Sequence, residues 1–372
     1  MKILQWALPY LPTRGGREVF ISRLSLDLKE MGHEIRVVAN ERSENSPFVE
    51  EVFEDFPILR LNLELLKDPK TSHTFAEALE RAHAFIRDMD PEIIHFHNTY
   101  DAGSLLLIEV LKKLEKRPKV VLTYHSLADH ETLVTGRKLD FLSRYIDCAI
   151  LPSKFNYSMV GAFSAIPRER LRFIYNGVPI PDSVERTEAA EPYFLYAGRL
   201  NSDKGVGVLL SALRLLVERY PEVRLKIAGA GLMEKQLKDF TQMINLESSV
   251  DFLGWKEQDE LRELIKGSLA VIMPSTLSEP FGLIGAEAQS LAVPLIASRV
   301  GGLAEIPEDS VTGLLLPAGD FGLLSQAMRY LYEHPEIRKS YGLAGAERAA
   351  ELFSIEKSHK AYEACFKELI SQ

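Results

Sequence analysis

Short runs of apolar residues alternate along the chain with longer segments in which apolar residues recur every three to four positions. The short runs are typical of buried strands, and the longer segments are typical of amphipathic helices. In the first half, strands are expected at residues 2–8, 34–39, 57–62, 92–97, 119–124, 147–152 and 171–176. In the second half, they are expected at 193–198, 223–229, 250–255, 269–274, 294–298 and 313–317. Such alternation predicts an α/β protein with parallel sheets covered on both faces.

The strand–helix series runs twice, which favours two doubly wound, Rossmann-like domains over one large sheet. The break falls in the segment NGVPIPDSVERTEAAEP, which is rich in proline and charge and has no periodicity. We therefore expect a first domain at residues 1–177 and a second at 178–352. The amphipathic end of the chain, 353–372, predicts a helix that packs back on the first domain.

Composition adds limits to this picture. The chain has 372 residues, of which 46% are hydrophobic and 26% charged, as in an ordinary soluble protein. No apolar run is long enough to span a bilayer, and the first residues are typical of a strand rather than a signal peptide. Cys148 and Cys365 are the only cysteines, which favours a reduced, cytoplasmic protein and leaves a single disulfide as an alternative.

The net charge of −9 is unevenly distributed. Residues 1–177 carry 24 Lys and Arg against 25 Asp and Glu, and the remainder carries 20 against 28, so the two parts have net charges of −1 and −8. An acidic second half is a poor surface for nucleic acid. Any phosphate bound there must be held by a few placed groups.

Two cations follow the apolar run YFLYA, at a position where parallel sheets bind ligands. Arg199 comes directly after Gly198, and Lys204 follows five residues later, where Asp203 is expected to cap the next helix. An anion between the two cations would also meet the helix N-terminus. The alternative is a surface loop with two solvated cations.

The stretch SEPFGLIGAE follows the strand expected at 269–274. Glu279 precedes a proline and is expected in the loop, and Pro280 suits the first position of a helix. That start would leave the backbone N–H groups of Phe281, Gly282 and Leu283 free at a positive helix end. Glu287 would then be the only charge of an apolar helix, either buried against a partner or facing solvent.

Histidines and a glycine pair mark the strand ends of the first half. Gly16 follows Gly15 before a helix, where a backbone can approach a ligand closely or simply turn. His125 follows the strand end at Tyr124, and His95 and His97 end another strand. The latter two lack clear further ligands, so we expect no metal site.

Two motifs resemble signatures of other enzyme classes without completing them. The sequence Gly229-Ala-Gly231 follows a strand as in a dinucleotide-binding site, but Glu234 stands where the third glycine belongs. Asp88-Met-Asp90 resembles the paired aspartates of metal-dependent sugar transferases. It precedes a strand, which places it at the wrong end of the sheet, and we expect a loop there.

Taken jointly, these segments resemble the retaining glycosyltransferases of the GT-B fold, family 4. The resemblance covers nearly the whole chain. It rests on TRGGREVFISRLSLDLKEMGHEIRVV, PEIIHFHN, LTYHS, ILPS, YNGV, AGRLNSDKG, IAGAG, FLGW, SEPFGLIGAE and the GG, AEI and GLLLP segments, in that order. It implies two facing domains with a C-terminal helix that crosses back to the first.

The resemblance also implies roles for individual residues. Arg199 and Lys204 would grip the donor diphosphate, Glu287 would accept the ribose hydroxyls, and Glu279 would meet the donor sugar. His125 would lie near that sugar and the reacting centre, and Gly16 would bring the first domain against the phosphate. The backbone groups that would hold the sugar, phosphate and base lie at Phe281, Gly282, Leu283, Gly229, Gly231 and Gly254.

The implied reaction moves a sugar from a nucleoside-diphosphate sugar, UDP- or GDP-linked, to an acceptor hydroxyl with retention and without a metal or other cofactor. Acceptor sugars, lipid-linked sugars and small molecules all remain open as partners. A nucleotide-sugar epimerase and a non-catalytic sugar-nucleotide binder are the alternatives. The basic end of SLLLIEVLKKLEKRPK could also contact the inner face of a membrane, against the alternative of a solvated helix end.

Overall fold

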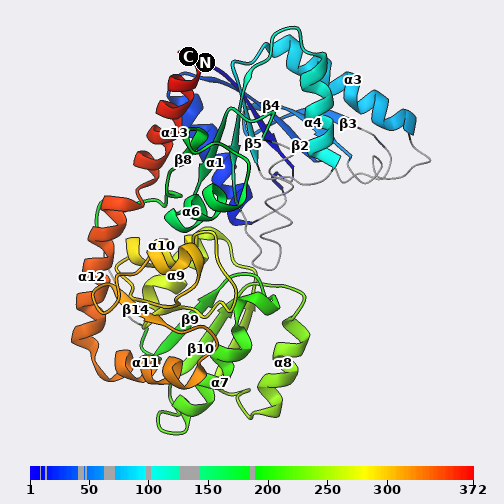
Figure 1. The fold of residues 1–372 in the computed structure, drawn as a ribbon. Coiled ribbons are helices and arrows are strands. Elements are labelled where there is room, and N and C mark those ends of the chain that lie inside the picture. Colours follow the sequence, from blue (N-terminus) through cyan, green and yellow to red (C-terminus); the bar gives the residue numbers. More distant parts are fainter. Residues whose placement is uncertain are drawn as a thin grey trace.

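The computed structural model describes residues 1–8, 10–12, 15–40, 46, 48–62, 72–97, 102–125, 143–184 and 189–372. These residues form two lobes, each built on one β-sheet with helices on both faces (Figure 1). The fold class predicted from the sequence is therefore confirmed. The first sheet ends at Phe173 and the second begins at Tyr193, and the domain limits between them stay predictions.

The first lobe holds an eight-stranded sheet in the order β3-β4-β2-β1-β5-β6-β7-β8. Its strands are β1 (Lys2–Ala7), β2 (Glu34–Asn40), β3 (Phe48–Phe53), β4 (Phe56–Leu61), β5 (Ile93–His97), β6 (Lys119–Thr123), β7 (Cys148–Leu151) and β8 (Leu171–Phe173). Its helices are α1 (Gly16–Glu30), α3 (Ser72–Met89), α4 (Ala102–Lys113) and α6 (Lys154–Phe163). The central strands are fully buried because helices cover both faces, as their continuous apolar runs predict.

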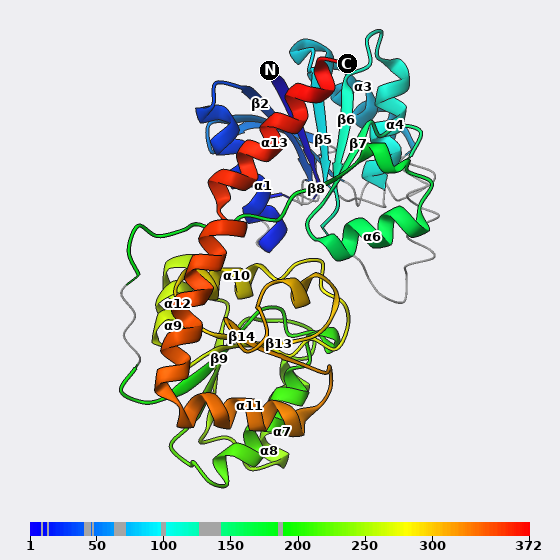
Figure 2. The ribbon, with the colours of Figure 1, turned by 60° about the vertical axis from the view of Figure 1, so that its left-hand side comes forward.

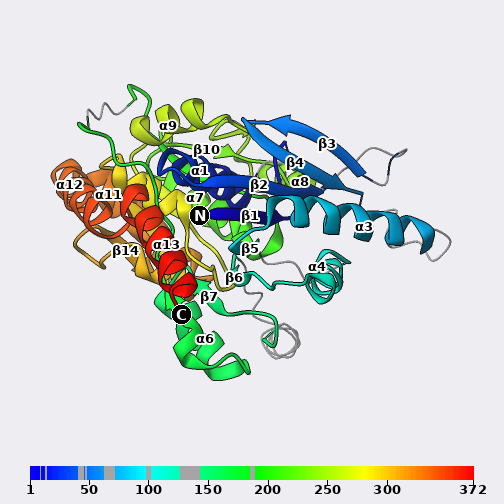
Figure 3. The same cartoon turned by 90° about the horizontal axis from the view of Figure 1, so that it is seen from above.

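Strand β3 corrects the expectation of a purely parallel sheet. It pairs with β4 in antiparallel register, through a turn in which Glu54 and Asp55 have positive φ angles. The sequence FVEEVF lacks an apolar run because β3 is an edge strand that keeps most of its side chains in contact with solvent. Figure 3 shows β3 and β4 at one border of this lobe.

The second lobe holds a six-stranded, wholly parallel sheet in the order β11-β10-β9-β12-β13-β14. Its strands are β9 (Tyr193–Ala197), β10 (Arg224–Ala228), β11 (Val250–Gly254), β12 (Val271–Met273), β13 (Leu295–Ser298) and β14 (Gly313–Leu316). Its helices are α7 (Val206–Val217), α8 (Glu234–Met243), α9 (Gln258–Gly267), α10 (Leu283–Ser290), α11 (Phe321–Glu333) and α12 (Pro335–Leu352). All six strands were expected from the apolar pattern.

The chain crosses between the lobes twice, and the two crossings touch. Val178 and Ser354 form an isolated parallel bridge, after which α13 (Ile355–Ile370) runs along the first lobe (Figure 2). Tyr362 and Phe366 of α13 are fully buried in the first-lobe core. The terminal helix thus packs back on the first lobe, as the sequence predicts.

The disulfide that the sequence left open is absent. Cys148 of β7 and Cys365 of α13 are free and buried, with their sulfur atoms 3.7 Å apart. No helix in the described ranges is long and apolar enough to cross a membrane.

Candidate active site

Three glycines bring the carboxyl ends of β9, β10 and β11 into direct contact. Gly198, Gly229 and Gly254 have φ angles of 153°, 149° and 67°, which residues with a side chain rarely adopt. The Gly229 N–H donates to the Gly254 carbonyl at 2.7 Å, and a Cβ on Gly229 would lie 1.8 Å from the Gly198 carbonyl oxygen. A Cβ on Gly231 would similarly lie 2.5 Å from the carbonyl oxygen of Leu200. This edge of the second sheet therefore presents bare backbone.

Lys204 and Glu279 form the charged centre of the site. The Lys204 ammonium donates to Glu279 Oε1 at 2.6 Å, and the Ser275 hydroxyl donates to the same oxygen at 2.7 Å. Only 8% of Glu279 is exposed. A carboxylate so far from water requires such partners, and a lysine and a hydroxyl supply them. Sequence reasoning overlooked Ser275, although it stands directly after the strand pattern that ends at Pro274.

The loop that carries Lys204 differs from the sequence prediction. Asp203 does not cap the next helix, because Ser202–Lys204 forms a 3₁₀ turn and α7 begins only at Val206. Gly205 precedes that helix with a φ angle of 67°, and the Asp203 carbonyl accepts from the Thr276 N–H at 2.9 Å. The turn is thereby fixed against the segment after β12, which brings Lys204 to Glu279.

Arg199, the second cation of the site, is unpaired among the described residues, unlike Lys204. It is exposed, and its guanidinium has no partner within the described part of the chain. Its backbone is fixed, since the Arg199 carbonyl accepts from the Tyr196 hydroxyl at 2.7 Å. The site therefore combines a half-buried lysine that is paired with a carboxylate and an arginine that remains available to an anion.

Helix α10 begins later than the sequence predicts. Its first residue is Leu283, and Gly282 before it has φ and ψ angles of 120° and 57°, which are not helical. Pro280 therefore lies in the loop, and the Phe281 ring is buried against Tyr175 and Phe353. The N–H groups of Phe281, Gly282 and Leu283 still lack any partner among the described residues. They can bind an anion at the positive end of the helix.

Helix α6 of the first lobe contacts the loop before α10 and the segment that carries Glu305. The Asn156 side-chain amide of α6 donates to the Pro280 carbonyl at 3.3 Å. The Glu305 carboxylate accepts from the backbone N–H groups of Lys154 and Phe155 at 3.0 and 2.7 Å. Glu305 of the second lobe thus caps the N-terminus of α6. This contact cannot be predicted from a local sequence pattern.

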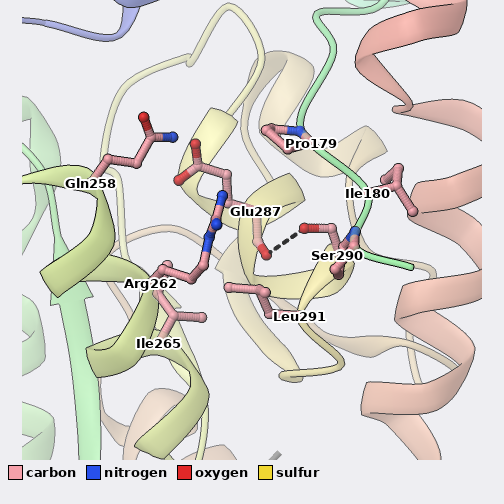
Figure 4. Close-up of a pocket in the computed structure, with 9 residues that line it drawn as sticks. Pro179, Ile180, Gln258, Arg262, Ile265, Glu287, Ser290 and Leu291 are labelled. Carbon is pink, nitrogen blue, oxygen red and sulfur yellow. Dashed lines mark hydrogen bonds between the residues drawn. The ribbon is translucent and has the colours of Figure 1, made fainter. Parts of the chain in front are cut away.

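Glu287 lines a separate cavity of about 110 Å³. The lining residues are Pro179, Ile180, Pro181, Gln258, Arg262, Ile265, Glu287, Ser290 and Leu291. The Glu287 carboxylate points toward Gln258 and Arg262 (Figure 4). Burial raises the pKa of this carboxyl group, and the charges of Arg23 and Arg262 partly oppose the rise. Glu287 therefore does not simply face solvent.

The two lobes meet above this cavity. Arg23 of α1 donates to Gln258 Oε1 of α9 at 2.5 Å. A Cβ on Gly16, at the start of α1, would lie 3.1 Å from Leu283 Cδ1 at the start of α10. Sequence reasoning identified Gly16 but not the Arg23–Gln258 contact, which joins residues 235 positions apart.

His125 contacts α1 at Phe20, one helical turn after Gly16. Its ring packs edge-on against Phe20, with the ring centres 5.4 Å apart, and it is partly exposed. Burial lowers its pKa well below the usual range, and the positive charge of Arg17 lowers it further. His125 is therefore a neutral ring at physiological pH.

Two pairs of residues in the sequence bear on a metal site: His95 with His97 at the end of β5, and Asp88 with Asp90 before β5. No cluster of three or more His, Cys, Asp or Glu residues in the described ranges is arranged to hold a metal ion. The prediction of a loop at Asp88 and Asp90 is partly wrong, because Asp88 lies in the last turn of α3. Asp88 forms an ion pair with Arg36, 2.8 Å apart, before the start of β5.

Comparison with known proteins relates this arrangement to sugar transfer. Residues 14–180 match the sequence model described as "Glycosyltransferase Family 4", and residues 182–348 match "Glycosyl transferases group 1". An uncharacterised glycosyltransferase of Methanocaldococcus jannaschii is 26% identical over 373 residues, which cover 99% of each chain.

Solved structures share the fold. Sucrose-phosphate synthase from Thermosynechococcus elongatus has a TM-score of 0.83 at 21% identity, covering 100% of this chain and 99% of that one. Anabaena HepE, solved in complex with UDP and glucose, has a TM-score of 0.81 at 19% identity, covering 99% of both chains. At these identities the likeness establishes the GT-B fold.

Proposed function

The chain belongs to the family-4 glycosyltransferases, and we propose that it moves a sugar from a nucleoside-diphosphate sugar to an acceptor hydroxyl with retention of configuration. Its membership makes it an enzyme of the glycosyltransferase class. The observation that carries the finer proposal is the Lys204–Glu279 pair, which directly precedes the unpartnered N–H groups of Phe281, Gly282 and Leu283 along the loop. Cation, carboxylate and helix end together match a phosphate joined to a polyol.

The diphosphate would lie between Arg199, Lys204 and the start of α10. Lys204 has three donor hydrogens, and its one bond to Glu279 leaves donor capacity for phosphate oxygens. Negative charge grows on the diphosphate as the glycosidic bond breaks, so donors already in place there stabilise the transition state. These groups supply positive charge without a metal or organic cofactor.

The two ends of the donor would meet the two glutamates. Glu279 would accept from hydroxyls of the transferred sugar, and Glu287 would accept from the ribose hydroxyls in the cavity that it lines. The bare backbone at Gly229, Gly231 and Gly254 would border the base. We propose a UDP- or GDP-linked sugar as the donor.

Retention is proposed to arise from attack on the face that the leaving diphosphate vacates. A covalent intermediate would require a nucleophile at the sugar. Glu279 is a poor one because its Oε1 already accepts from both Lys204 and Ser275, which hold its negative charge. We therefore favour same-face displacement by the acceptor hydroxyl.

We propose that the acceptor, which can be a sugar, a lipid-linked sugar or a small molecule, binds the first lobe in the cytoplasm. Contact with the inner face of a membrane would rely on the basic segment at 112–119. There Lys112, Lys113 and Arg117 already pair with Glu109, Glu80 and Asp147. The segment therefore offers anionic lipid less charge than its sequence implies.

An epimerase would use the same donor site without an acceptor, and a non-catalytic binder would leave the donor intact. Incubation with donor alone separates the three functions. A transferase releases nucleoside diphosphate slowly as water replaces the acceptor, an epimerase produces an isomer of the donor, and a binder changes nothing.

A thermal-shift screen of UDP, GDP and ADP sugars tests the proposal. A ligand at about a hundred times its Kd adds about 2.7 kcal/mol to the free energy of unfolding, so one nucleotide should raise the Tm clearly. The shift should shrink in Lys204→Met and persist in Lys235→Met, which changes an exposed lysine of α8. No shift with any nucleotide sugar contradicts the proposed function.

A further inference from the structure

Two buried polar side chains of the first lobe, Gln5 and His97, form a continuous row with the partly exposed His125. Gln5 of β1 and His97 of β5 are joined by a 2.8 Å hydrogen bond between Gln5 Oε1 and His97 Nε2. The other nitrogen of His97, Nδ1, lies 3.0 Å from His125 Nε2. The rings of His97 and His125 are stacked with their centres 5.3 Å apart. Gln5 is fully buried and His97 is 1% exposed.

The number of protons in this row follows from its surroundings. Burial, the neighbouring imidazoles and the charge of Arg17 lower the pKa of both His97 and His125 well below the usual range. Each ring is therefore neutral at physiological pH and carries one N–H. A neutral ring with partners at both nitrogens must donate at one and accept at the other. All hydrogen bonds of the row are therefore donated in the same direction.

Gln5 sets that direction. Its Oε1 atom can only accept, so His97 Nε2 carries the hydrogen and donates to it. His97 Nδ1 is then bare and accepts from His125 Nε2–H. The single hydrogen of His125 is thereby used, and its Nδ1 atom is left as an acceptor. That atom has no partner among the residues the structure describes.

The row ends at the boundary between the lobes. His125 is partly exposed and packs on Phe20, which stands one helical turn after Gly16 on α1. Gly16 in turn lies against Leu283, where α10 begins. A sugar bound at the start of α10 would therefore lie within reach of His125.

We propose that Gln5 and His97 are positioning residues that hold His125 in the Nε2–H form and turn its bare Nδ1 toward a hydroxyl of the bound sugar. The inference rests on the proposed function and deepens it. His125 then acts as an uncharged hydrogen-bond acceptor, a partner that a sugar hydroxyl can satisfy by donating. Neither positioning residue touches the substrate.

His95 provides the matched control. It lies two residues before His97 on the same strand, is fully buried, and has its ring centre 4.0 Å from that of His97. Its Nε2 atom pairs with the Thr123 hydroxyl at 2.7 Å, so it stands outside the row. His95→Gln should disturb packing as much as a His97 variant does, without changing the tautomer of His125.

The direct test is the tautomer of His125 in the ligand-free protein, measured by long-range ¹H–¹⁵N NMR of the ¹⁵N-histidine-labelled chain. The His125 signals are assigned by their loss in His125→Gln. The expected result is a single Nε2–H form in the wild-type protein and in His95→Gln. A His125 that carries its hydrogen on Nδ1, or exchanges between both forms, overturns the proposal whether or not the variants fold.

Two His97 variants separate positioning from packing. His97→Leu removes the acceptor, so His125 should populate both tautomers, and kcat should fall about tenfold while the Kd for nucleoside diphosphate stays unchanged. His97→Asn keeps an amide oxygen near the position of Nδ1 and should restore most of both readouts. An unchanged tautomer or an unchanged kcat in His97→Leu contradicts the inference. If no sugar transfer is found at all, the proposed function is wrong. The tautomer measurement still tests the role of Gln5 and His97, because it uses the ligand-free protein and needs no activity.

Discussion

Glu279 lies in the loop before α10 and Glu287 within α10, and the two carboxylates differ in what already binds them. Glu279 is paired with the Lys204 ammonium and accepts from the Ser275 hydroxyl, whereas Glu287 shares a cavity with Arg262 and has a pKa raised by burial. A carboxylate held by a cation before the donor arrives is suited to the reacting sugar. A carboxylate in a cavity is suited to a hydroxyl-bearing group that enters with the ligand.

Replacing each glutamate by glutamine should therefore give different kinetic results. Glu287→Gln loses a charge-assisted hydrogen bond, which costs about 1.5–3 kcal/mol in nucleotide binding, so the donor KM should rise with kcat less affected. Glu279→Gln should lower kcat about a hundredfold while free nucleotide still binds, because the sugar ring gains positive charge in the transition state. Steady-state kinetics and titration with the bare nucleoside diphosphate measure both. Loss of nucleotide binding in Glu279→Gln alone would reverse the two roles.

The raised pKa of Glu287 predicts a pH effect on binding. Only the ionised carboxylate makes the charge-assisted bond, so nucleotide affinity should weaken as the pH falls through the raised pKa. Glu287→Gln should show only the pH dependence of the nucleotide itself. Titration calorimetry of both proteins from pH 8 to about pH 5 provides the comparison. Parallel pH profiles would show that this carboxyl group does not bind the nucleotide.

The same pKa shift has a consequence for the stability of the ligand-free protein. Between the unfolded value of 4.5 and the raised folded value, the folded chain binds more protons than the unfolded chain. The contribution of Glu287 to stability therefore falls as the pH rises through that window. Glu287→Gln should gain in Tm relative to wild type at pH 7, and the gain should be smaller near pH 4.5. A constant difference across this range would contradict the assignment.

At the scale of elements, α13 ties the end of the chain to the first lobe. Phe366 is fully buried in the core that α13 shares with β1 and β7, and His359 forms a short hydrogen bond with Asp27 of α1. Because the crossing before α13 is bridged to Val178, this helix also fixes one of the two connections between the lobes.

Phe366→Ala should therefore lower the free energy of unfolding by about 3–5 kcal/mol, the usual cost of a cavity left by a buried phenylalanine. Phe163→Ala serves as the control, since Phe163 is 49% exposed at the end of α6. Urea unfolding followed by tryptophan fluorescence measures both losses, because Trp6 lies in the first-lobe core. Equal losses in the two variants would mean that α13 does not stabilise this lobe.

The elements were predictable wherever local pattern and burial agree. Apolar runs located every strand except β3, whose sequence FVEEVF reflects an exposed edge. Strand ends located Arg199, Lys204, Glu279 and Gly229, since parallel strands bring their carboxyl ends to one edge. The start of α10 was misplaced because burial of Phe281 and the angles of Gly282 decide it. The Arg23–Gln258 and Glu305–α6 contacts were missed because they depend on how the lobes meet.

For the whole molecule, we propose that the protein's own cations and backbone N–H groups supply the positive charge at the donor phosphates that a metal ion supplies in metal-dependent transferases. The Arg199 guanidinium has no partner among the described residues, and Lys204 is bonded to Glu279, which stands four residues before the start of α10. We expect sugar transfer to continue in excess EDTA. Activity that is lost on chelation and restored by Mg²⁺ or Mn²⁺ would overturn the metal-independent proposal.

The most direct measurement of the central claim is the product formed from an α-linked nucleotide sugar, chosen as the one that raises the Tm most. With water as the acceptor, ¹H NMR follows the release of nucleoside diphosphate and the anomeric proton of the freed sugar before it equilibrates. The account predicts release of the diphosphate together with the α-anomer, and a strong reduction of both in Lys204→Met. Initial formation of the β-anomer, or an isomerised donor without release of nucleotide, would contradict it.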